Sequence, residues 1–214
     1  MIRVISSLLV LAYLLVVVAS AQAADPINWP LSQTVIANDE ARLKAILVTH
    51  PSQDELDFAL IAGTGKGRLE PVRLLLVAGA NPNRHIGFAG HSSIIVAVRE
   101  NQPETLDILL QHHGDPNATD RIGCPPLHHT VGPQYEHPET IRVLVKHGAA
   151  VNARDGLQRT VLHRAAGFGH AEAVRALLAL GADPALRDKD GFTALARAER
   201  GGHRTIAALL QKAR

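Results

Sequence analysis

The chain has 214 residues, of which 20% are charged, and a formal net charge of +2. This balance, without a basic cluster of five or more residues, gives no electrostatic ground for a nucleic-acid-binding protein. Aromatic residues make up only 3% of the chain, so Ala, Leu and Val must fill the interior. Such a composition favours closely packed small-residue helices over a thick β-sheet core.

Residues 1–24 form a separate segment. Arg3 supplies a positive start, residues 8–18 are an unbroken apolar run, and residues 21–23 (Ala-Gln-Ala) have the small-x-small pattern that a signal peptidase cleaves. We predict a secretory signal peptide over residues 1–24 and a periplasmic or secreted mature protein. The alternative is an uncleaved membrane anchor, because residues 4–21 approach the roughly 18 to 20 residues that span a bilayer.

A divergent helical pair follows at about residues 29 to 50, within residues 25–53. Its second apolar stripe consists of Leu43, Ile46 and Leu47. We predict that this pair caps the N-terminal end of the array that begins at residue 54.

The rest of the chain contains an internal repeat. The sequence TVLHRA at 160–165 recurs in the following unit as TALARA at 193–198 and in the preceding unit as PPLHHT at 125–130, with a fainter copy, SSIIVA, at 92–97. Each copy precedes a second apolar stripe spaced i, i+3, i+4, which is one face of a helix. These stripes are Leu106/Leu109/Leu110, Ile141/Leu144/Val145, Val174/Leu177/Leu178 and Ile206/Leu209/Leu210.

Each unit reads as two short antiparallel helices and an extended loop. Thr160 can cap the first helix, Gly169 separates the two helices, Glu172 suits the positive start of the second, and Gly181 can take the left-handed conformation that ends it. Neither helix could bury its stripe alone. Stacked units share one continuous core, so we predict a solenoid.

The period of about 33 residues, the Thr-x-Leu-His-x-Ala-Ala of residues 160–166, the Gly-His of 169–170 and the Gly-Ala-Asp-Pro of 181–184 resemble ankyrin repeats. The resemblance covers roughly residues 54–213. It implies an all-α solenoid of paired antiparallel helices with extended hairpin loops, in about five to six repeats. The array, residues 54–214, would divide at approximately 54–80, 81–114, 115–149, 150–182 and 183–214.

The chain has twelve histidines, which could have either a structural role or a catalytic or metal-binding one. The resemblance implies that His128 and His163, in the Thr-x-Leu-His turn, brace the backbone within and between units. His137, His170 and His203 each open a second helix, and they follow one another at the period of the repeat. Repetition in phase indicates a structural role for all five.

Metal and enzyme motifs give little support to a catalytic protein. The adjacent pairs His112-His113 and His128-His129 point about 100° apart on a helix, so neither pair can easily hold one ion. Combinations of residues across loops stay open. No G-x-S-x-G or H-E-x-x-H motif occurs, and we interpret residues 63–67 (GTGKG) as an inter-helix turn. We predict no metal, no cofactor and no enzymatic activity; an active site assembled from loops is the alternative.

Cys124 is the only cysteine, so no internal disulfide can form. It lies just ahead of a helix expected to begin near Pro125, and a helix N-terminus can lower the pKa of a thiol. Cys124 is therefore a candidate reactive thiol. The alternative is a small residue that fills a slot in the loop.

The resemblance to ankyrin repeats implies that loop tips and exposed first-helix positions on the concave side bind other proteins. Exposed aromatic and arginine side chains dominate binding hot spots. For this reason two aromatic loop residues, Tyr135 and Phe88, are added to the candidate binding residues. The alternative is that these aromatic side chains pack against neighbouring loops. The candidate partner-binding residues are Arg121, Ile122, Leu157, Arg159, Phe168, Lys189, Asp190, Phe192 and Arg200, together with Tyr135 and Phe88.

We therefore predict an exported, monomeric, non-catalytic binding module whose partner is another protein, with no nucleic acid and, after signal cleavage, no membrane. The chain resembles short exported bacterial ankyrin-repeat proteins, some linked to oxidative-stress protection and others to the neutralisation of toxic effectors. The alternative is a structural or chaperone-like periplasmic factor without a single partner.

Overall fold

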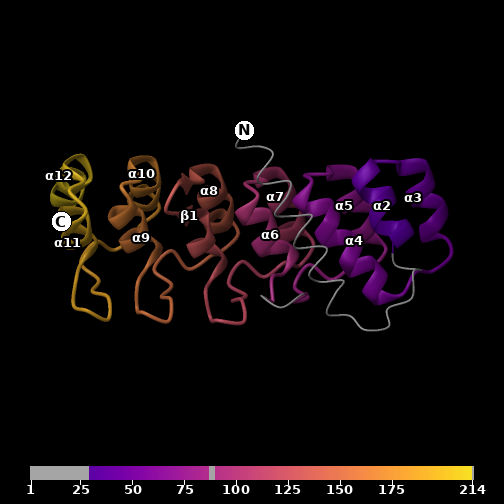
Figure 1. Cartoon of the computed structure of the whole chain (residues 1–214), viewed down its shortest axis with the longest axis horizontal. Helices are drawn as coiled ribbons and strands as arrows, with labels where there is room; N and C mark the ends of the chain where they lie inside the picture. Colours follow the sequence, from indigo (N-terminus) through magenta and orange to yellow (C-terminus); the bar gives the residue numbers. More distant parts are fainter. Residues whose placement is uncertain (1–28, 87–89, 214) are drawn as a thin grey trace.

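The computed structural model describes residues 29–86 and 90–213 and contains eleven α-helices, α2 to α12, in these two segments. The helices form an elongated array that runs from α2 and α3 at one end to α11 and α12 at the other (Figure 1). The predicted signal peptide, residues 1–24, and the candidate residue Phe88 lie outside the described residues. None of the described helices combines the length and the apolar character that a membrane span requires.

The array has two layers of helices. The first helix of each unit packs against the first helix of the next, and the second helices pack in the same way. The first layer consists of α4 (Gln53–Gly65), α6 (Ser93–Arg99), the 3₁₀ helix η2 (Pro126–Thr130), α9 (Val161–Phe168) and α11 (Ala194–Arg200). The second layer consists of α5 (Leu69–Val77), α7 (Pro103–Gln111), α8 (Pro138–Lys146), α10 (Ala171–Ala179) and α12 (Arg204–Lys212).

The N-terminal pair extends both layers. Helix α2 (Trp29–Ala37) packs against α4, and α3 (Glu40–Leu47) packs against α5. We call the surface formed by the first helices of the array and by the loops that precede them the first-helix face.

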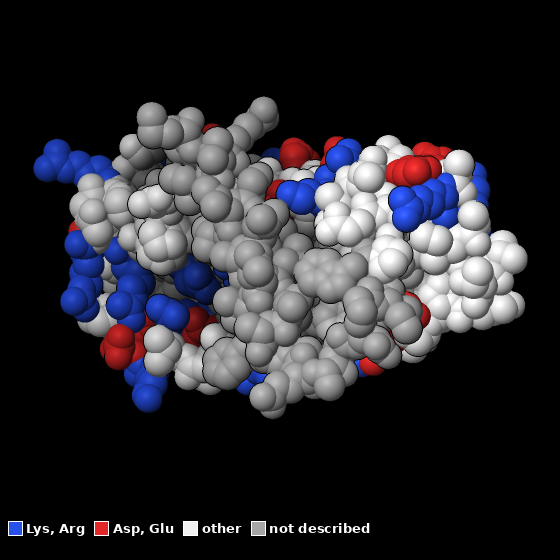
Figure 2. Space-filling model, turned by 45° about the vertical axis from the view of Figure 1, so that its right-hand side comes forward, with Lys and Arg blue, Asp and Glu red and all other residues white. Residues whose placement is uncertain are grey.

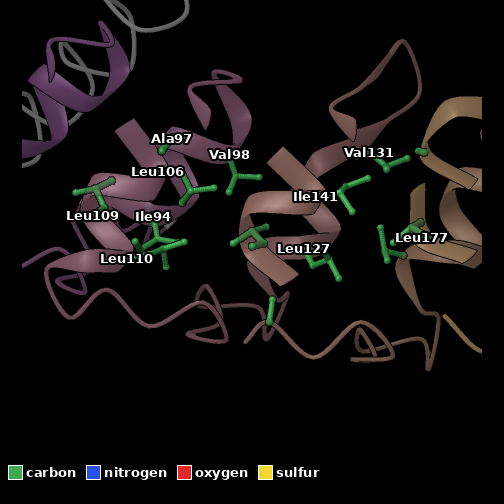
Figure 3. Packing of buried hydrophobic residues seen from close by; sticks show 14 of the residues in the cluster. Ile94, Ala97, Val98, Leu106, Leu109, Leu110, Leu127, Val131, Ile141 and Leu177 are labelled. Atoms are coloured by element: carbon green, nitrogen blue, oxygen red, sulfur yellow. The ribbon is translucent and has the colours of Figure 1, made fainter. Parts of the chain in front are cut away.

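The core lies between the layers and repeats along the array. One leucine position recurs in five successive second helices, and each of these leucines is fully buried: Leu75, Leu109, Leu144, Leu177 and Leu210. Figure 3 shows how the stripes of neighbouring units meet, with Leu106, Leu109 and Ile94 on one side and Leu127 and Ile141 on the other. The predicted solenoid core, in which each stripe is covered by its neighbours, is confirmed.

The predicted local signals around α9 and α10 are also confirmed. Thr160 is the N-cap of α9 and forms a capping box with His163. Gly169 and Gly181 have φ angles of 87° and 86°, in the left-handed region that only glycine enters without strain. Glu172 lies in the first turn of α10, where its charge complements the helix dipole.

The predicted turn at residues 63–67 is wrong in part, because α4 continues through Gly65. Gly63 is required inside the helix by close packing, since a Cβ atom there would lie 2.7 Å from Val35 Cγ1 of α2. The turn itself is shorter and begins at Lys66.

The third unit departs from the expected helical pair. Its first helix is the short 3₁₀ helix η2, followed by a β-hairpin of β1 (Val131–Gly132) and β2 (Tyr135–Glu136) with Val131 opposite Glu136. A helix does begin near Pro125, as expected, but it is a short 3₁₀ helix and not an α-helix. Pro133 disfavours a helical conformation at Gly132, so the inserted residues leave the helix and pair as strands.

Candidate functional site

Two buried histidines tie the third unit to the fourth and the fourth unit to the fifth. His128 Nε2 lies 2.8 Å from the carbonyl oxygen of Arg159, and His163 Nε2 lies 3.1 Å from that of Phe192. Both acceptors are in the loop of the following unit. Burial lowers the pKa of both imidazoles, so each is neutral at pH 7 and donates one N–H. The predicted bracing role is confirmed.

The histidines that open the second helices bind backbone as well. His137, His170 and His203 are the N-caps of α8, α10 and α12. Their ring nitrogens lie 3.0, 2.6 and 3.1 Å from the carbonyl oxygens of Val98, Gly132 and Gly167, at or near the end of the preceding unit's first-layer segment. These contacts confirm the structural role, because each ring has a nitrogen engaged by a backbone carbonyl.

An aspartate holds the loop of the fourth unit on the first-helix face. Asp155 Oδ1 accepts the backbone N–H groups of Leu157 and Arg159 at 2.9 and 3.0 Å, and its Oδ2 pairs with Arg159 Nη2 at 2.8 Å. Burial opposes ionisation of Asp155, but the hydrogen bonds from Arg159 and the backbone hold its pKa below the usual value. The Arg159 side chain is thereby fixed on the surface.

Asp188 repeats this arrangement one unit later. Its Oδ1 accepts the N–H groups of Asp190 and Phe192, each at 3.0 Å, and its Oδ2 pairs with Arg197 Nη2 at 2.5 Å. Arg197 also reaches Asp190 at 2.7 Å. Two arginines therefore stand beside buried carboxylates at neighbouring positions of the array.

A groove of about 270 Å³ lies on the first-helix face between α9 and α11. Arg197 and Arg200 stack over Phe192, with guanidinium carbons 4.8 and 4.5 Å from the ring centroid, and Arg164 lies 6.0 Å from the ring of Phe168. Figure 2 shows Lys and Arg side chains gathered at the end of the molecule that carries these helices. The main lining residues are Arg159, His163, Arg164, Phe168, Arg197 and Arg200.

The groove contains a cationic surface that its carboxylates do not offset. Asp155, Asp188 and Asp190 pair with Arg159 and Arg197. In the described part of the chain, Arg164 donates to the carbonyl oxygen of Val131 at 3.1 Å, and Arg200 contacts the Phe192 ring, rather than a carboxylate. Arg164 also contacts the Cys124 thiol. Arg200, and the N–H groups of Arg164 that these contacts do not use, can donate to an anionic ligand beside the two rings.

The structure brings some of the predicted partner-binding residues together and separates others. Arg159, Phe168 and Arg200 line the groove, and Phe192 supports it. Tyr135 stands apart in the β-hairpin, stacked on His137 at 4.9 Å between centroids, and Phe88 is outside the described residues. Exposed loop tips carry the remaining candidates, Arg121, Ile122, Leu157, Lys189 and Asp190.

Sequence reasoning missed two groove arginines, Arg164 and Arg197. Both occupy the second position after the leucine of the Thr-x-Leu motif, one repeat apart. The signal was present in the repeat alignment, because an arginine recurs at this first-helix position. Only the distances show that these side chains reach the surface beside Phe168 and Phe192.

The expected lowering of the Cys124 pKa is wrong. Cys124 is 7% exposed, and desolvation raises the pKa of its thiol to about 11. The adjacent helix η2 is a short 3₁₀ helix, whose dipole is too small to offset the loss of hydration. Burial favours an unreactive thiol at neutral pH.

Within the described segments, one group of three potential metal donors occurs: Asp120, Cys124 and His129. One donor atom from each lies within 4.8 Å of the other two. This group is not one of the adjacent histidine pairs of the sequence; it belongs to the combinations across loops, which the sequence leaves open.

A comparison with protein families agrees with the geometry. The family model described as "Ankyrin repeats (3 copies)" matches residues 58–155, 93–188 and 127–214. The overlapping matches cover the array from the middle of α4 to the C-terminal helix and include the whole groove.

Proposed function

The chain belongs to the ankyrin-repeat family, and on this premise we propose that it is an exported, non-catalytic module that binds another protein through the first-helix face. Ankyrin repeats generally mediate protein–protein interaction. The observation that carries the proposed site is the arginine-lined groove between α9 and α11.

The groove has the composition of a binding hot spot. Arginine and aromatic side chains contribute most to interface energies when they lie next to one another in a partly enclosed surface. Here Phe168 is 37% exposed, and Arg200 is held over the Phe192 ring. Preorganised side chains lose less conformational entropy on binding than free ones.

The charge of the groove selects the partner. Arg164 and Arg200 offer guanidinium donors that suit carboxylates, whereas the two phenylalanine rings suit an apolar or aromatic side chain. The proposed partner therefore presents an exposed segment in which acidic residues flank an apolar one. Attraction between such a segment and the groove weakens as salt screens the charges.

Export and a monomeric state are part of the same proposal. Residues 1–24, with their apolar run and Ala-Gln-Ala sequence, support export by their pattern. The module would then work in the periplasm or outside the cell, where a link to stress protection or to the neutralisation of a toxic effector fits a binding protein without catalysis.

The test is capture of the partner from the periplasmic or extracellular fraction of the native cells, with the purified protein as bait. The informative variant is Phe168→Ala combined with Arg200→Glu, because both side chains are exposed and neither replaces a core residue. Arg175→Glu is the matched control. It makes the same charge change as Arg200→Glu, but one repeat earlier and on the second helix α10.

We expect one protein to bind the wild type and the control alike, and to bind the double variant about tenfold or more weakly. Its affinity for the wild type should fall with rising salt. Equal binding by the wild type and the double variant, with both shown to be folded by circular dichroism, would exclude the groove as the binding site.

A further inference from the structure

The loop and first helix of the third unit contain three side chains with metal-binding atoms. One carboxylate oxygen of Asp120, the thiol sulfur of Cys124 and one ring nitrogen of His129 all lie within 4.8 Å of one another. Asp120 and Cys124 are buried, and the His129 side chain is 15% exposed. The fold thus already brings the three donor atoms together, and solvent reaches the group at the partly exposed His129 side chain.

The loop leaves one oxygen of Asp120 aimed at the cluster. Asp120 Oδ1 accepts the backbone N–H groups of Ile122 and Cys124 at 3.0 and 2.9 Å, and the Asp120 N–H donates to the Cys124 carbonyl at 3.1 Å. Oδ2 lies 3.1 Å from His129 Nε2. Backbone hydrogen bonds therefore orient both the carboxylate and the residue that carries the thiol, as partners behind a metal ligand do.

Comparison with the next two units shows what is unusual here. Asp155 and Asp188 hold the same loop position as Asp120, and each pairs through Oδ2 with a guanidinium group. The cation comes from Arg159 in one unit and from Arg197 in the other.

In the third unit both of these arginine positions carry metal donors instead. The repeat alignment places Cys124 where Arg159 stands and His129 where Arg197 stands. The buried carboxylate thus faces a thiol and an imidazole at the two places from which its equivalents receive a positive charge. Arg164 acts on the Cys124 thiol and Arg99 on the His129 ring, but among the described residues neither forms an ion pair with Asp120. A bound cation would pair with this carboxylate directly.

From this geometry we propose that Asp120, Cys124 and His129 form a mononuclear site for a divalent transition-metal ion of the Zn²⁺ class. Carboxylate oxygen, imidazole nitrogen and thiolate sulfur are the ligands that Zn²⁺ takes in proteins, and three protein ligands leave a fourth position for water. Bonds of about 2.0–2.3 Å place tetrahedral ligands about 3.3–3.8 Å apart, so the side chains need to draw together only slightly.

Binding balances charge without any redox step. The Cys124 thiol releases its proton to solvent as the sulfur–metal bond forms, because the thiolate is the ligand. The charges of the thiolate and of the Asp120 carboxylate then offset those of the dication. The ion links the loop at residues 120–124 to η2, which gives the third unit a structural metal site in addition to the proposed partner-binding surface.

The test uses Co²⁺ as a probe, because it shares the tetrahedral preference of Zn²⁺ and gives a near-ultraviolet charge-transfer band when a thiolate is a ligand. The reduced, chelator-treated protein is titrated with Co²⁺ and then with Zn²⁺. We expect a thiolate band that saturates at one Co²⁺ per chain in monomeric protein, and its loss when Zn²⁺ displaces the probe. Zn²⁺ should also slow the modification of Cys124 by a thiol reagent.

Three variants separate this site from adventitious binding by other histidines. Cys124→Ser should abolish the band, and His129→Gln should weaken Co²⁺ binding about tenfold or more. The matched control replaces the adjacent pair at the end of α7, His112→Gln with His113→Asn, and should leave the band and the affinity unchanged.

Two results would overturn the proposal. One is a folded wild type that shows no thiolate band at millimolar Co²⁺. The other is a band whose affinity is unchanged in His129→Gln, since the thiolate would then bind Co²⁺ without the cluster. Neither result depends on the identity of the partner protein, so the proposed metal site and the proposed function are tested independently.

Discussion

At the scale of single residues, burial decides what the histidines do. Desolvation is the largest cause of a lowered pKa at each histidine with a shift, and it takes that of His129 to about 4. A neutral imidazole can donate one N–H to a carbonyl of the next unit while it stays desolvated. The histidines with lowered pKa are His91, His128, His129, His137 and His163.

These shifts predict that the protein loses stability in mild acid. Histidines in the unfolded chain bind protons near pH 6.5, whereas the buried ones in the folded protein bind them only at lower pH. The unfolded state therefore holds more protons below pH 6.5, and the free energy of unfolding falls with pH until each folded pKa is reached. Each histidine contributes up to about 1.4 kcal/mol per pH unit in its window.

Urea unfolding of the chelator-treated protein at pH 7.5, 6.5 and 5.5 measures this slope. The variant His137→Gln removes one titrating group. The slope of the unfolding free energy against pH should therefore fall by up to about 1.4 kcal/mol per pH unit, which corresponds to one proton. The carboxylates with lowered pKa, Asp107, Asp155 and Asp188, lose their contribution only as the pH falls below their usual range, so they do not affect this window. A free energy that is constant from pH 7.5 to 5.5 would contradict the prediction.

At the scale of elements, the β-hairpin inserted after η2 takes part in the packing of the next unit. Helix α10 has no side-chain N-cap, since His170 makes no capping bond. Instead Glu136 Oε2, at the end of β2, accepts the backbone N–H of Ala173 at 2.7 Å. An element from one unit thus satisfies the exposed N-terminal donors of a helix in the next.

This contact predicts that Glu136→Ala destabilises the protein by about 1–3 kcal/mol, because it removes a charge-assisted hydrogen bond and a favourable charge at the helix N-terminus. The free energy of urea unfolding at neutral pH measures the loss. Glu139→Ala serves as the control, since Glu139 is exposed and its ion pair is with Arg142 on its own helix. Its expected cost is below about 1 kcal/mol. Equal effects of the two substitutions would show that the hairpin does not cap α10.

At the scale of the whole molecule, stability comes from contacts between neighbouring units. The fully buried leucines Leu75, Leu109, Leu144, Leu177 and Leu210 each pack between their own unit and the adjacent ones. In such an array every interface depends on its neighbours, and a weak central interface can separate the unfolding of the two ends. The 3₁₀ helix η2 and helix α8 belong to a unit near the middle of the array, which Figure 1 marks by its labels β1 and α8.

We therefore expect Leu144→Ala to cost about 2–5 kcal/mol through the cavity it leaves, and to divide unfolding into two steps. The single tryptophan, at the start of α2, reports on the N-terminal end by fluorescence, while circular dichroism reports on all helices. Noncoincident urea transitions in the variant, with coincident ones in the wild type, are the expected result. Coincident transitions in both would show that the array unfolds as one cooperative unit.

The sequence by itself determined the repeat and its local signals. The recurrence of TVLHRA from unit to unit, with an i, i+3, i+4 stripe after each copy, predicts stacked helical pairs because no single pair can bury its own stripe. Thr160, Gly169 and Gly181 act through hydrogen bonds and φ angles within a short stretch of chain, so they too could be recognised along the sequence.

The tertiary structure alone decided what lies between units. Arg164, Arg197 and Arg200 converge with Phe168 because α9 and α11 pack side by side, and spacing along the chain does not give that distance. The pKa of Cys124 rises because neighbouring groups exclude water from it, which a reading of the adjacent residues cannot show. Contacts and desolvation depend on which atoms meet through space, and these set both the groove and the proposed metal site.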